Sequence, residues 1–201
     1  TEQYIEVIEK ERGNLFAAPE ISMVMAAEGR ARNAYYNAYN LILKNGFEFN
    51  KRERRPPTDP VDALISFGNS LMYITVLGEI YKTQLDPTIS YLHEPSTKRF
   101  SLSLDVSEIF KPLIVDPIIF TLINNNMITM DDFDIEESVC MLNERGRKKF
   151  IREYENKLQT TIKHRKLNRH VSYRSFILLE CYKLIKYFLD DELYKPLKAW
   201  W

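Results

Sequence analysis

Apolar residues recur every three or four positions along most of the chain, which is the spacing of amphipathic α-helices. This pattern predicts a short charged helix over residues 2–12, ended near Gly13, and a long helix over about 19–43. Asp59 can cap a helix whose residues 63–81 are apolar on nearly all sides, so we expect this helix to be central and buried. Small residues on it would let neighbouring helices approach closely, namely Ser66, Gly68, Ser70 and Gly78.

The second half of the chain also reads as mainly helical. A helix over about 101–125 should kink or break where Pro112 and Pro117 interrupt it. The further predicted elements are a short strand over 138–142 and helices over 144–161 and 176–189, which Asn143 and Ser172 can cap. We therefore predict a mainly α fold, with residues 1–201 forming one multi-helix domain that holds at most a short strand pair.

Composition narrows the picture without identifying a function. Basic and acidic residues each number 28, so the formal net charge is zero and nothing global indicates a nucleic-acid binder. Cys140 and Cys181 lack a CxxC spacing, which favours buried thiols in a reducing cytoplasm. We see no apolar run of transmembrane length and no signal peptide. The sequence opens inside an amphipathic pattern without a starting Met, so we expect it to be a piece of a longer protein.

Several acidic residues fall in segments that are otherwise apolar. Glu28 lies in the middle of a predicted apolar stripe that includes Ile21 and Met25. Asp105 and Glu108 stand three residues apart, so on a helix they share one face. A carboxylate on a core-facing surface is costly unless it is paired or bound to a cation. The pattern leaves two interpretations open, a metal site and structural ion pairs such as one between Glu28 and Arg32, one helical turn away.

The metal interpretation brings one histidine together with these acids. His93 lies in the loop before Asp105, and Lys111 continues the row formed by Asp105 and Glu108. Three carboxylates and one imidazole suit Mg²⁺ or Mn²⁺ better than zinc, which favours thiolates or more histidines. There is no glycine-rich phosphate loop, no paired Glu-x-x-His motif and no spacing that supports a nucleophilic triad. A hard metal beside basic segments favours phosphodiester chemistry, in which Lys111 could stabilise developing charge.

Positive charge is concentrated in two segments. Residues 51–55 form a short basic cluster before a pair of prolines. Residues 144–174 hold eleven lysines and arginines against three acidic residues, a local excess of eight, with tyrosines and histidines interleaved. Each segment is either an ordinary solvated surface or a phosphate-contacting surface.

Ordered motifs along nearly the whole chain resemble the CRISPR-associated integrase family, whose metal-dependent DNA endonucleases insert new spacers into CRISPR arrays. The motifs that carry this resemblance are Arg54-Arg-Pro-Pro-Thr-Asp-Pro-Val61, Leu64-Ile-Ser-Phe-Gly68, Leu85-Asp-Pro87, Leu92-His-Glu-Pro95, Phe100-Ser-Leu-Ser-Leu-Asp105, Glu108-Ile-Phe-Lys-Pro112 and Val171-Ser-Tyr-Arg174. The resemblance implies a helical catalytic domain that forms the C-terminal part of a cytoplasmic prokaryotic protein.

The resemblance also assigns roles to particular residues. It implies that Glu28, His93 and Asp105 hold one Mg²⁺ or Mn²⁺, that Glu108 is a second acidic position beside the metal, and that Lys111 is the basic residue next to the site. A DNA 3′-hydroxyl would then attack a phosphodiester of the repeat. The residues expected to contact DNA phosphates are Arg54, Arg55, Lys163, Arg165, Arg169 and Arg174.

The resemblance also implies binding partners, and this sequence differs from the family pattern at a few points. Relatives carry an N-terminal β-rich domain that supports a homodimer, which this sequence lacks, and they act on protospacer and repeat DNA with a small ferredoxin-like partner protein. Asp62 stands where Asn is expected and Ser90 where Gly is usual. The alternatives are a nuclease selective for branched DNA and a DNA-binding scaffold without catalysis.

Overall fold

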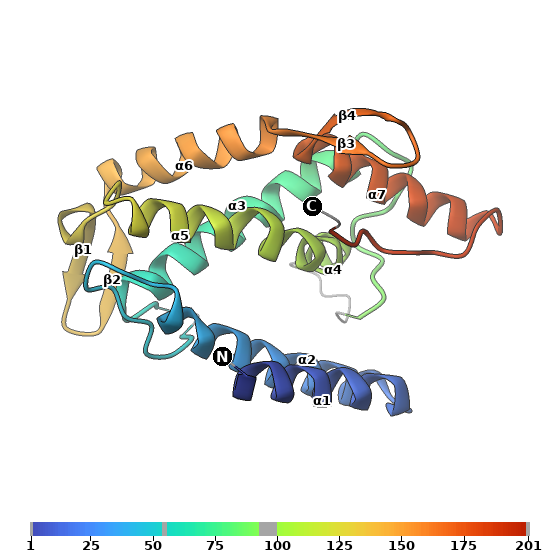
Figure 1. Cartoon of the computed structure of the whole chain (residues 1–201). Coiled ribbons are helices and arrows are strands. Elements are labelled where there is room, and N and C mark those ends of the chain that lie inside the picture. The colour runs from blue at the N-terminus through green and yellow to red at the C-terminus, as the bar shows by residue number, and fades with distance from the viewer. Residues whose placement is uncertain (1, 54–55, 93–99, 200–201) are drawn as a thin grey trace. The chain divides into compact units, whose positions relative to one another are not determined.

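The computed structural model describes residues 2–53, 56–92 and 100–199. Contacts divide the chain into two compact units, one made of Thr1–Ser66 with Phe120–Gly146 and the other of Phe67–Ile119 with Arg147–Trp201. Helices dominate both units, and the strands of the described part form two separate two-stranded antiparallel sheets (Figure 1). The prediction of a mainly α fold is confirmed.

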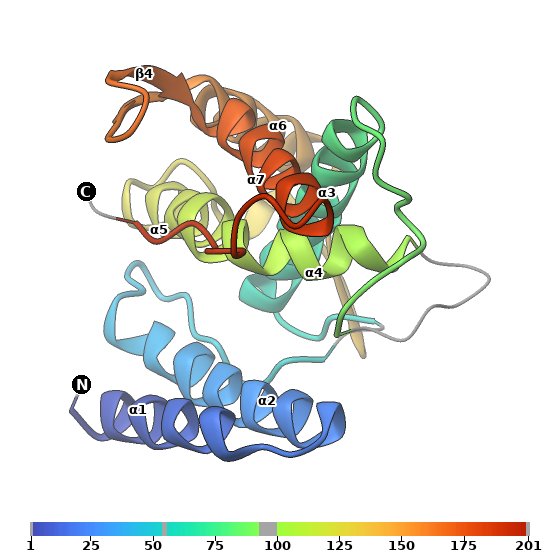
Figure 2. The same cartoon turned by 90° about the vertical axis from the view of Figure 1, so that its right-hand side faces the viewer.

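The first unit begins with two helices that lie side by side as a hairpin, α1 (Glu2–Ala17) and α2 (Ile21–Asn37) (Figures 1 and 2). The predicted end of α1 near Gly13 is wrong, because an exposed glycine inside a helix costs only about 1 kcal/mol and α1 continues for one more turn. The long predicted helix is confirmed as α2 followed by the 3-10 turn η1 (Ala38–Leu41). Its predicted apolar stripe is partly wrong, since Ile21 is 56% and Met25 41% exposed.

Aromatic rings and two asparagines join the segment after α2 to the end of α5 (Asp116–Asn124). The rings of Tyr39 and Phe120 meet edge to face with centroids 4.7 Å apart. Asn45 donates to the carbonyl of Ile123 at 2.7 Å. The backbone turns at Asn45 and Gly46, whose positive φ values of 60° and 77° favour these two residue types.

A short hairpin completes the first unit, with β1 (Phe133–Glu136) paired to β2 (Val139–Leu142) after the 3-10 turn η3 (Met130–Asp132). The strand predicted over 138–142 is therefore confirmed. The sequence did not predict its partner, β1. This strand lies in an acidic run without a clear alternation of apolar and polar residues, and only one of its side chains is buried. The amide of Cys140 also donates to the carbonyl of Pro57 at 2.8 Å, which holds the hairpin to the segment before α3.

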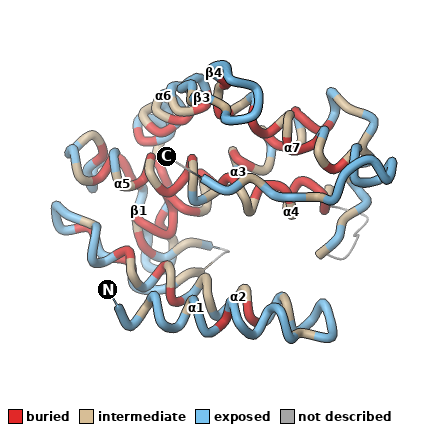
Figure 3. Tube along the Cα trace, turned by 45° about the vertical axis from the view of Figure 1, so that its right-hand side comes forward, coloured by how far each residue is buried: buried red, intermediate tan, exposed pale blue. Residues whose placement is uncertain are grey.

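Helix α3 (Pro60–Ile80) begins in the first unit and ends in the second. Asp59 caps it as predicted, since its Oδ1 accepts from the amide of Asp62 at 2.8 Å. Leu64, Met72 and Ile80 have no exposed surface. Figure 3 colours several parts of α3 as buried. The prediction that no apolar run reaches transmembrane length needs correction, because α3 is long and apolar enough by length and composition, although buried side chains of this kind are typical of a core helix.

The glycines of α3 differ in their surroundings. A Cβ at Gly68 would overlap Val115 and lie 2.9 Å from Cζ of Phe150, so this glycine permits close packing as predicted. A Cβ at Gly78 would meet nothing within 4 Å. The packing role predicted for Gly78 is therefore wrong.

In the second unit, α4 (Ser101–Phe110) continues into one turn of π-helix, η2 (Lys111–Val115), before α5. The π-turn includes Pro112, so the predicted interruption at this proline is confirmed. Such turns relieve the clash and the missing hydrogen bond that a proline causes inside a helix, and they are frequent near functional sites.

The remaining elements are α6 (Glu144–Gln159), β3 (Thr161–His164), β4 (Arg169–Ser172) and α7 (Tyr173–Phe188). Asn143 caps α6 by accepting from the amide of Gly146 at 3.0 Å, and Ser172 caps α7 by accepting from the amide of Ser175 at 3.2 Å, both as predicted. The basic segment between these helices contains the β3–β4 hairpin, a second strand pair in addition to the single pair that the sequence predicted. Both thiols are buried as expected, and this burial raises the pKa of Cys140 to about 11 and of Cys181 to about 12.

Candidate functional site

Asp105 lies in the second turn of α4 and fixes the loop that precedes this helix. Its Oδ2 accepts hydrogen bonds from the backbone amides of Tyr91 at 2.8 Å and Leu92 at 3.1 Å. His93 itself lies outside the described residues.

Two further contacts hold the same loop to the start of α4. Ser101 donates from Oγ to the carbonyl of Thr88 at 2.9 Å, and the amide of Leu102 donates to the carbonyl of Pro87 at 3.0 Å. Asp86 stabilises the turn by accepting from the amide of Thr88 at 2.8 Å. The chain that leads to His93 is thus anchored at successive positions, and sequence patterns gave no indication of these backbone contacts.

Glu108 and Lys111 form an ion pair one turn further along the same helical face. Their side chains keep only 21% and 13% of their surface exposed, so the pair is largely shielded from solvent. The predicted row of Asp105, Glu108 and Lys111 on one face is consistent with this pairing. It places a positive charge next to a carboxylate in a protected setting, where electrostatic interactions are stronger than in water.

Glu28 is held by Arg32, as one of the two sequence interpretations predicted. Nη2 of Arg32 lies 2.5 Å from Oε1 of Glu28, and the two side chains are 25% and 32% exposed. Glu28 belongs to the first unit and Asp105 to the second. The structure shows Glu28 in this ion pair, and a metal-binding role of Glu28 stays a prediction.

The metal interpretation depends on the chemistry of the donors. Carboxylate oxygens and one imidazole are ligands that a hard divalent cation such as Mg²⁺ or Mn²⁺ accepts, and Glu28, Asp105 and Glu108 are all partly exposed. Across residues 2–53, 56–92 and 100–199, no group of three or more His, Cys, Asp or Glu side chains could hold a metal ion. A metal site therefore remains a prediction that requires His93.

The first basic cluster is partly neutralised within the first unit. Arg52 forms an ion pair with Asp62, which is fully buried, and donates to Oγ of Ser66 at 2.9 Å. Burial raises the pKa of Asp62, and the charge of Arg52 opposes that rise. The unusual acid at position 62 thus anchors Arg52, while the predicted DNA contacts Arg54 and Arg55 lie outside the described residues.

The β3–β4 hairpin carries the second basic cluster in the second unit. Lys163 pairs with His170 across the strands, and both side chains are exposed, as are Arg165 and Arg169. The fourth predicted contact in this unit, Arg174, instead pairs with carboxylates, at 3.2 Å from Glu155 and 3.8 Å from Glu79. Contact of these four residues with DNA stays a prediction.

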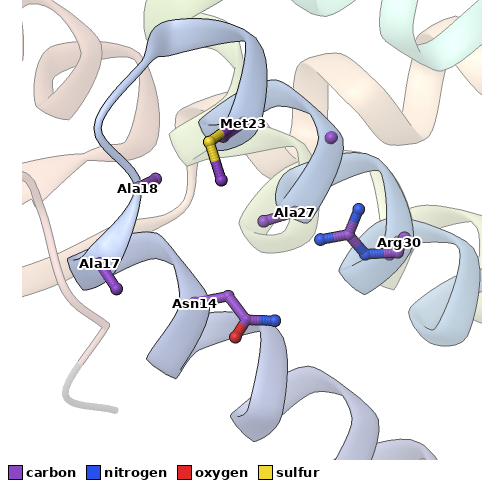
Figure 4. Close-up of a pocket in the computed structure, with 7 residues that line it drawn as sticks. Asn14, Ala17, Ala18, Met23, Ala27 and Arg30 are labelled. Carbon is purple, nitrogen blue, oxygen red and sulfur yellow. The ribbon is translucent and has the colours of Figure 1, made fainter.

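A hollow of about 300 Å³ lies between α1 and α2 of the first unit (Figure 4). Met23 and alanines form much of its wall, with Asn14 and Arg30 at its edge. Glu11 accepts from Nε of Arg30 at 2.8 Å, so this arginine is already paired. None of the predicted site residues that the structure describes lines this hollow, and its described walls offer no group suited to catalysis.

Comparison with known proteins gives one consistent family. The family model described as "CRISPR associated protein Cas1" matches residues 1–156. A CRISPR-associated endonuclease Cas1 from Clostridium perfringens is 68% identical over 204 residues, which is 100% of this chain and 62% of that protein. A solved CAS1 protein from Thermotoga maritima is 42% identical with a TM-score of 0.87, over 94% of this chain and 59% of that one.

A more distant solved structure agrees in fold alone. It is a Cas6-RT-Cas1–Cas2 complex, 23% identical with a TM-score of 0.84, matched over 98% of this chain and 22% of that one. The chain spans about three fifths of the length of the curated relatives it matches, 62% for the relative from Clostridium perfringens.

Proposed function

Because the chain belongs to the CRISPR associated protein Cas1 family, we propose that it is the catalytic part of a DNA endonuclease and integrase of CRISPR adaptation. The observation that carries the proposal is its 68% identity, over the whole chain, with a protein named as a CRISPR-associated endonuclease. The residues that the family resemblance assigns to the site are all present in the sequence, from Glu28 to Lys111. The proposal concerns the activity of proteins of the relatives' length, of which this chain spans 62% in the case of the relative from Clostridium perfringens.

Glu28, His93 and Asp105 would hold one Mg²⁺ or Mn²⁺ in this proposal. The ion, when bound, supplies Lewis-acid activation of an attacking oxygen and neutralises charge on the phosphate. Asp105 contributes a second function of its own, since its hydrogen bonds to Tyr91 and Leu92 keep the start of the His93 loop beside α4. One carboxylate would thereby position a neighbouring ligand as well as act as one.

Glu108 and Lys111 would act on the reacting groups. Glu108 orients the attacking water or hydroxyl, and Lys111 stabilises the negative charge that develops on the phosphate oxygens. Their ion pair sets the position of the Lys111 ammonium before DNA arrives, which avoids reorganisation during the reaction. In strand joining, a 3′-hydroxyl oxygen loses its proton and bonds to phosphorus, the bond to the leaving 3′-oxygen of the repeat breaks, and this leaving oxygen takes up a proton.

The β3–β4 hairpin would contact the DNA backbone. Within the described part of the chain, neither Lys163 nor Arg169 forms an ion pair with an acidic side chain, so both charges remain available to phosphates. Burial and the charges of nearby lysines and Arg169 lower the pKa of His164, which is consistent with a positive local potential. A positive ribbon of this kind suits sequence-independent contact with phosphates.

Partners follow from the family rather than from this chain. One structural relative belongs to a complex named "Cas6-RT-Cas1--Cas2 complex". For the full-length protein we expect a homodimer that works with a small ferredoxin-like partner protein on protospacer and repeat DNA.

A strand-joining assay with the full-length protein tests the proposal. DNA with a free 3′-hydroxyl and a labelled repeat duplex should give a joined product in the presence of Mg²⁺ or Mn²⁺. Asp105→Ala should abolish joining while DNA binding is largely retained, and Asp134→Ala, which removes an exposed carboxylate on β1, should leave joining unchanged. Nicking without joining would favour a nuclease for branched DNA. Unchanged joining by Asp105→Ala would exclude the proposed site.

A further inference from the structure

His164 closes the turn of the β3–β4 hairpin with both its side chain and its backbone. Its ring nitrogen Nδ1 accepts from the amide of Leu167 at 3.1 Å, and its carbonyl accepts from the amide of Asn168 at 2.8 Å. Asn168 has a positive φ of 49°, which asparagine tolerates better than most residues do. One residue therefore satisfies two backbone amides of a short exposed turn.

The imidazole of His164 also packs on α7. Its ring stacks on the ring of Phe176, with centroids 5.4 Å apart and planes inclined by 18°. Phe176 is only 2% exposed, so it belongs to the core of the second unit. The stacking thus joins the turn to a buried side chain and restricts the direction in which Nδ1 points.

The turn that His164 closes carries positive charge. Arg165 and Lys166 lie in the turn, and Lys163 and Arg169 lie on the strands beside it. All four side chains are exposed. Side chains and loops that become ordered only on binding lose conformational freedom, which offsets part of the gain from a new contact. A turn that is fixed before binding reduces this loss.

We infer that His164 is a positioning residue for the contact of the basic hairpin with DNA phosphates, because it holds the turn through a neutral ring. This inference rests on the proposed function. Nδ1 can accept a hydrogen bond only in the neutral imidazole, since both ring nitrogens are donors when the ring is protonated. Protonation of His164 would therefore release the amide of Leu167 and loosen the turn.

The surroundings of the ring favour its neutral form. Burial and the positive charges of Lys183, Lys166 and Arg169 lower the pKa of His164 from its ordinary value of 6.5. Lys183 comes from α7, where it pairs with Glu180 at 2.7 Å, and the other two residues belong to the hairpin. Because the pKa of the folded state lies below that of the unfolded chain, the neutral ring stabilises the turn above pH 6.5, and this contribution is lost as the pH falls through the folded pKa.

Two substitutions in the full-length protein separate the acceptor from the ring. His164→Phe keeps a flat ring without an acceptor, whereas His164→Asn keeps an acceptor, Oδ1, at the bond position of Nδ1. At neutral pH, His164→Phe should speed amide exchange at Leu167 about fivefold. It should also lower the slope of log affinity for duplex DNA against log salt by about 1, although no basic residue has changed. His164→Asn should retain both wild-type values.

The pH profile gives a second measurement that needs no variant. As the pH falls, protection of the Leu167 amide should decrease together with the protonation of His164, followed by nuclear magnetic resonance, and His164→Asn should lack this step. His170→Phe is the matched control, because it makes the same replacement at an exposed imidazole of the same hairpin, and it should leave exchange at Leu167 unchanged. Protection that does not follow the titration of His164 would overturn the role of the neutral ring.

A double variant, Lys163→Gln with Arg169→Gln, separates this inference from the proposed function. If the double variant weakens DNA binding while His164→Phe binds like the wild type, the positioning role is wrong and the hairpin interface stands. If the double variant binds DNA like the wild type, the hairpin interface is wrong and the positioning role falls with it. An equal loss of DNA binding in His164→Phe and His164→Asn would also overturn the role of the acceptor.

Discussion

The backbone nitrogen of Tyr91 lies 2.8 Å from Oδ2 of Asp105, so this acid serves as a tether for the loop that leads to His93. We predict different effects for two substitutions of Asp105. Asp105→Asn keeps an oxygen that can accept from Tyr91, whereas Asp105→Ala removes it and leaves two amides without this partner. Because hydrogen bonds to a charged group contribute about 1.5 to 3 kcal/mol each, amide exchange at Tyr91 and Leu92 should speed at least about tenfold in Asp105→Ala.

Metal binding should not distinguish the two substitutions, because both remove the negative charge of Asp105. Asp105→Asn and Asp105→Ala should therefore lose Mn²⁺ binding alike, although only Asp105→Ala loosens the loop. Equal exchange rates at Tyr91 in the two variants would contradict the tether.

Salt dependence tests the basic hairpin. Neutralising Lys163 and Arg169 with glutamine should weaken DNA binding and lower the slope of log affinity against log salt by about 2, because each lost phosphate contact changes the slope by about 1. Fluorescence anisotropy with duplex DNA at several salt concentrations measures this slope. Lys10→Gln, on the exposed face of α1, removes one positive charge away from the hairpin, and a slope lowered by about 1 in this variant would argue against a hairpin interface.

The two glycines of α3 should respond oppositely to alanine. Gly68→Ala should lower the free energy of unfolding by about 1 to 3 kcal/mol, because the new Cβ would overlap Val115 and crowd Phe150. Gly78→Ala should raise it by about 0.5 to 1 kcal/mol, since its Cβ would meet nothing within 4 Å and alanine favours a helix. Chemical denaturation of both variants checks the difference in sign, and a loss of stability in Gly78→Ala would refute the packing analysis.

The ion pair between Glu11 and Arg30 should make stability depend on pH. Hydrogen bonds from Arg30 and Asn14 lower the pKa of Glu11 to about 2, from an ordinary value of 4.5. Because the pKa of the folded state lies below that of the unfolded chain, the carboxylate stabilises the fold above pH 4.5, and this contribution is lost as the pH falls toward 2.

Denaturation of the wild type and Glu11→Gln across this pH range measures the contribution. The difference in unfolding free energy should be largest at neutral pH and should shrink steadily as the carboxylate is protonated. Glu9→Gln offers a control, because Glu9 pairs with Arg12 at the exposed surface and such pairs contribute little. A difference that does not change with pH would show that the charge of Glu11 is not responsible.

The sequence predicted the starts of helices well, because a single capping residue can determine where a helix begins. Asp59, Asn143 and Ser172 each cap a helix, because a side-chain oxygen satisfies an amide a few residues away. The β-hairpins were harder, because the partner of a strand is chosen by register and burial rather than by its own composition. The acidic run that contains β1 and the basic run that contains β3 show charge far more clearly than alternation.

The candidate site was predictable only at the level of single residues and helical faces. The pairing of Glu108 with Lys111 and of Glu28 with Arg32 follows from spacing along a helix. The contact between Tyr91 and Phe188 joins residues almost a hundred positions apart, so no local pattern could indicate it. Hydrogen bonds from backbone amides cannot be predicted from the sequence either, since every residue except proline has a backbone amide that can donate.

The burial of Asp62 against Arg52 has an electrostatic consequence for the segment before α3. Lys51 pairs with Glu53 and Arg52 with Asp62, so each of these two positive charges is matched by a neighbouring carboxylate. A polyanion that approaches this segment would therefore meet a weaker positive potential than the number of basic residues in the segment suggests. Replacing Asp62 with asparagine would remove one negative charge, so the net charge of this segment would become more positive by one unit without any new basic residue.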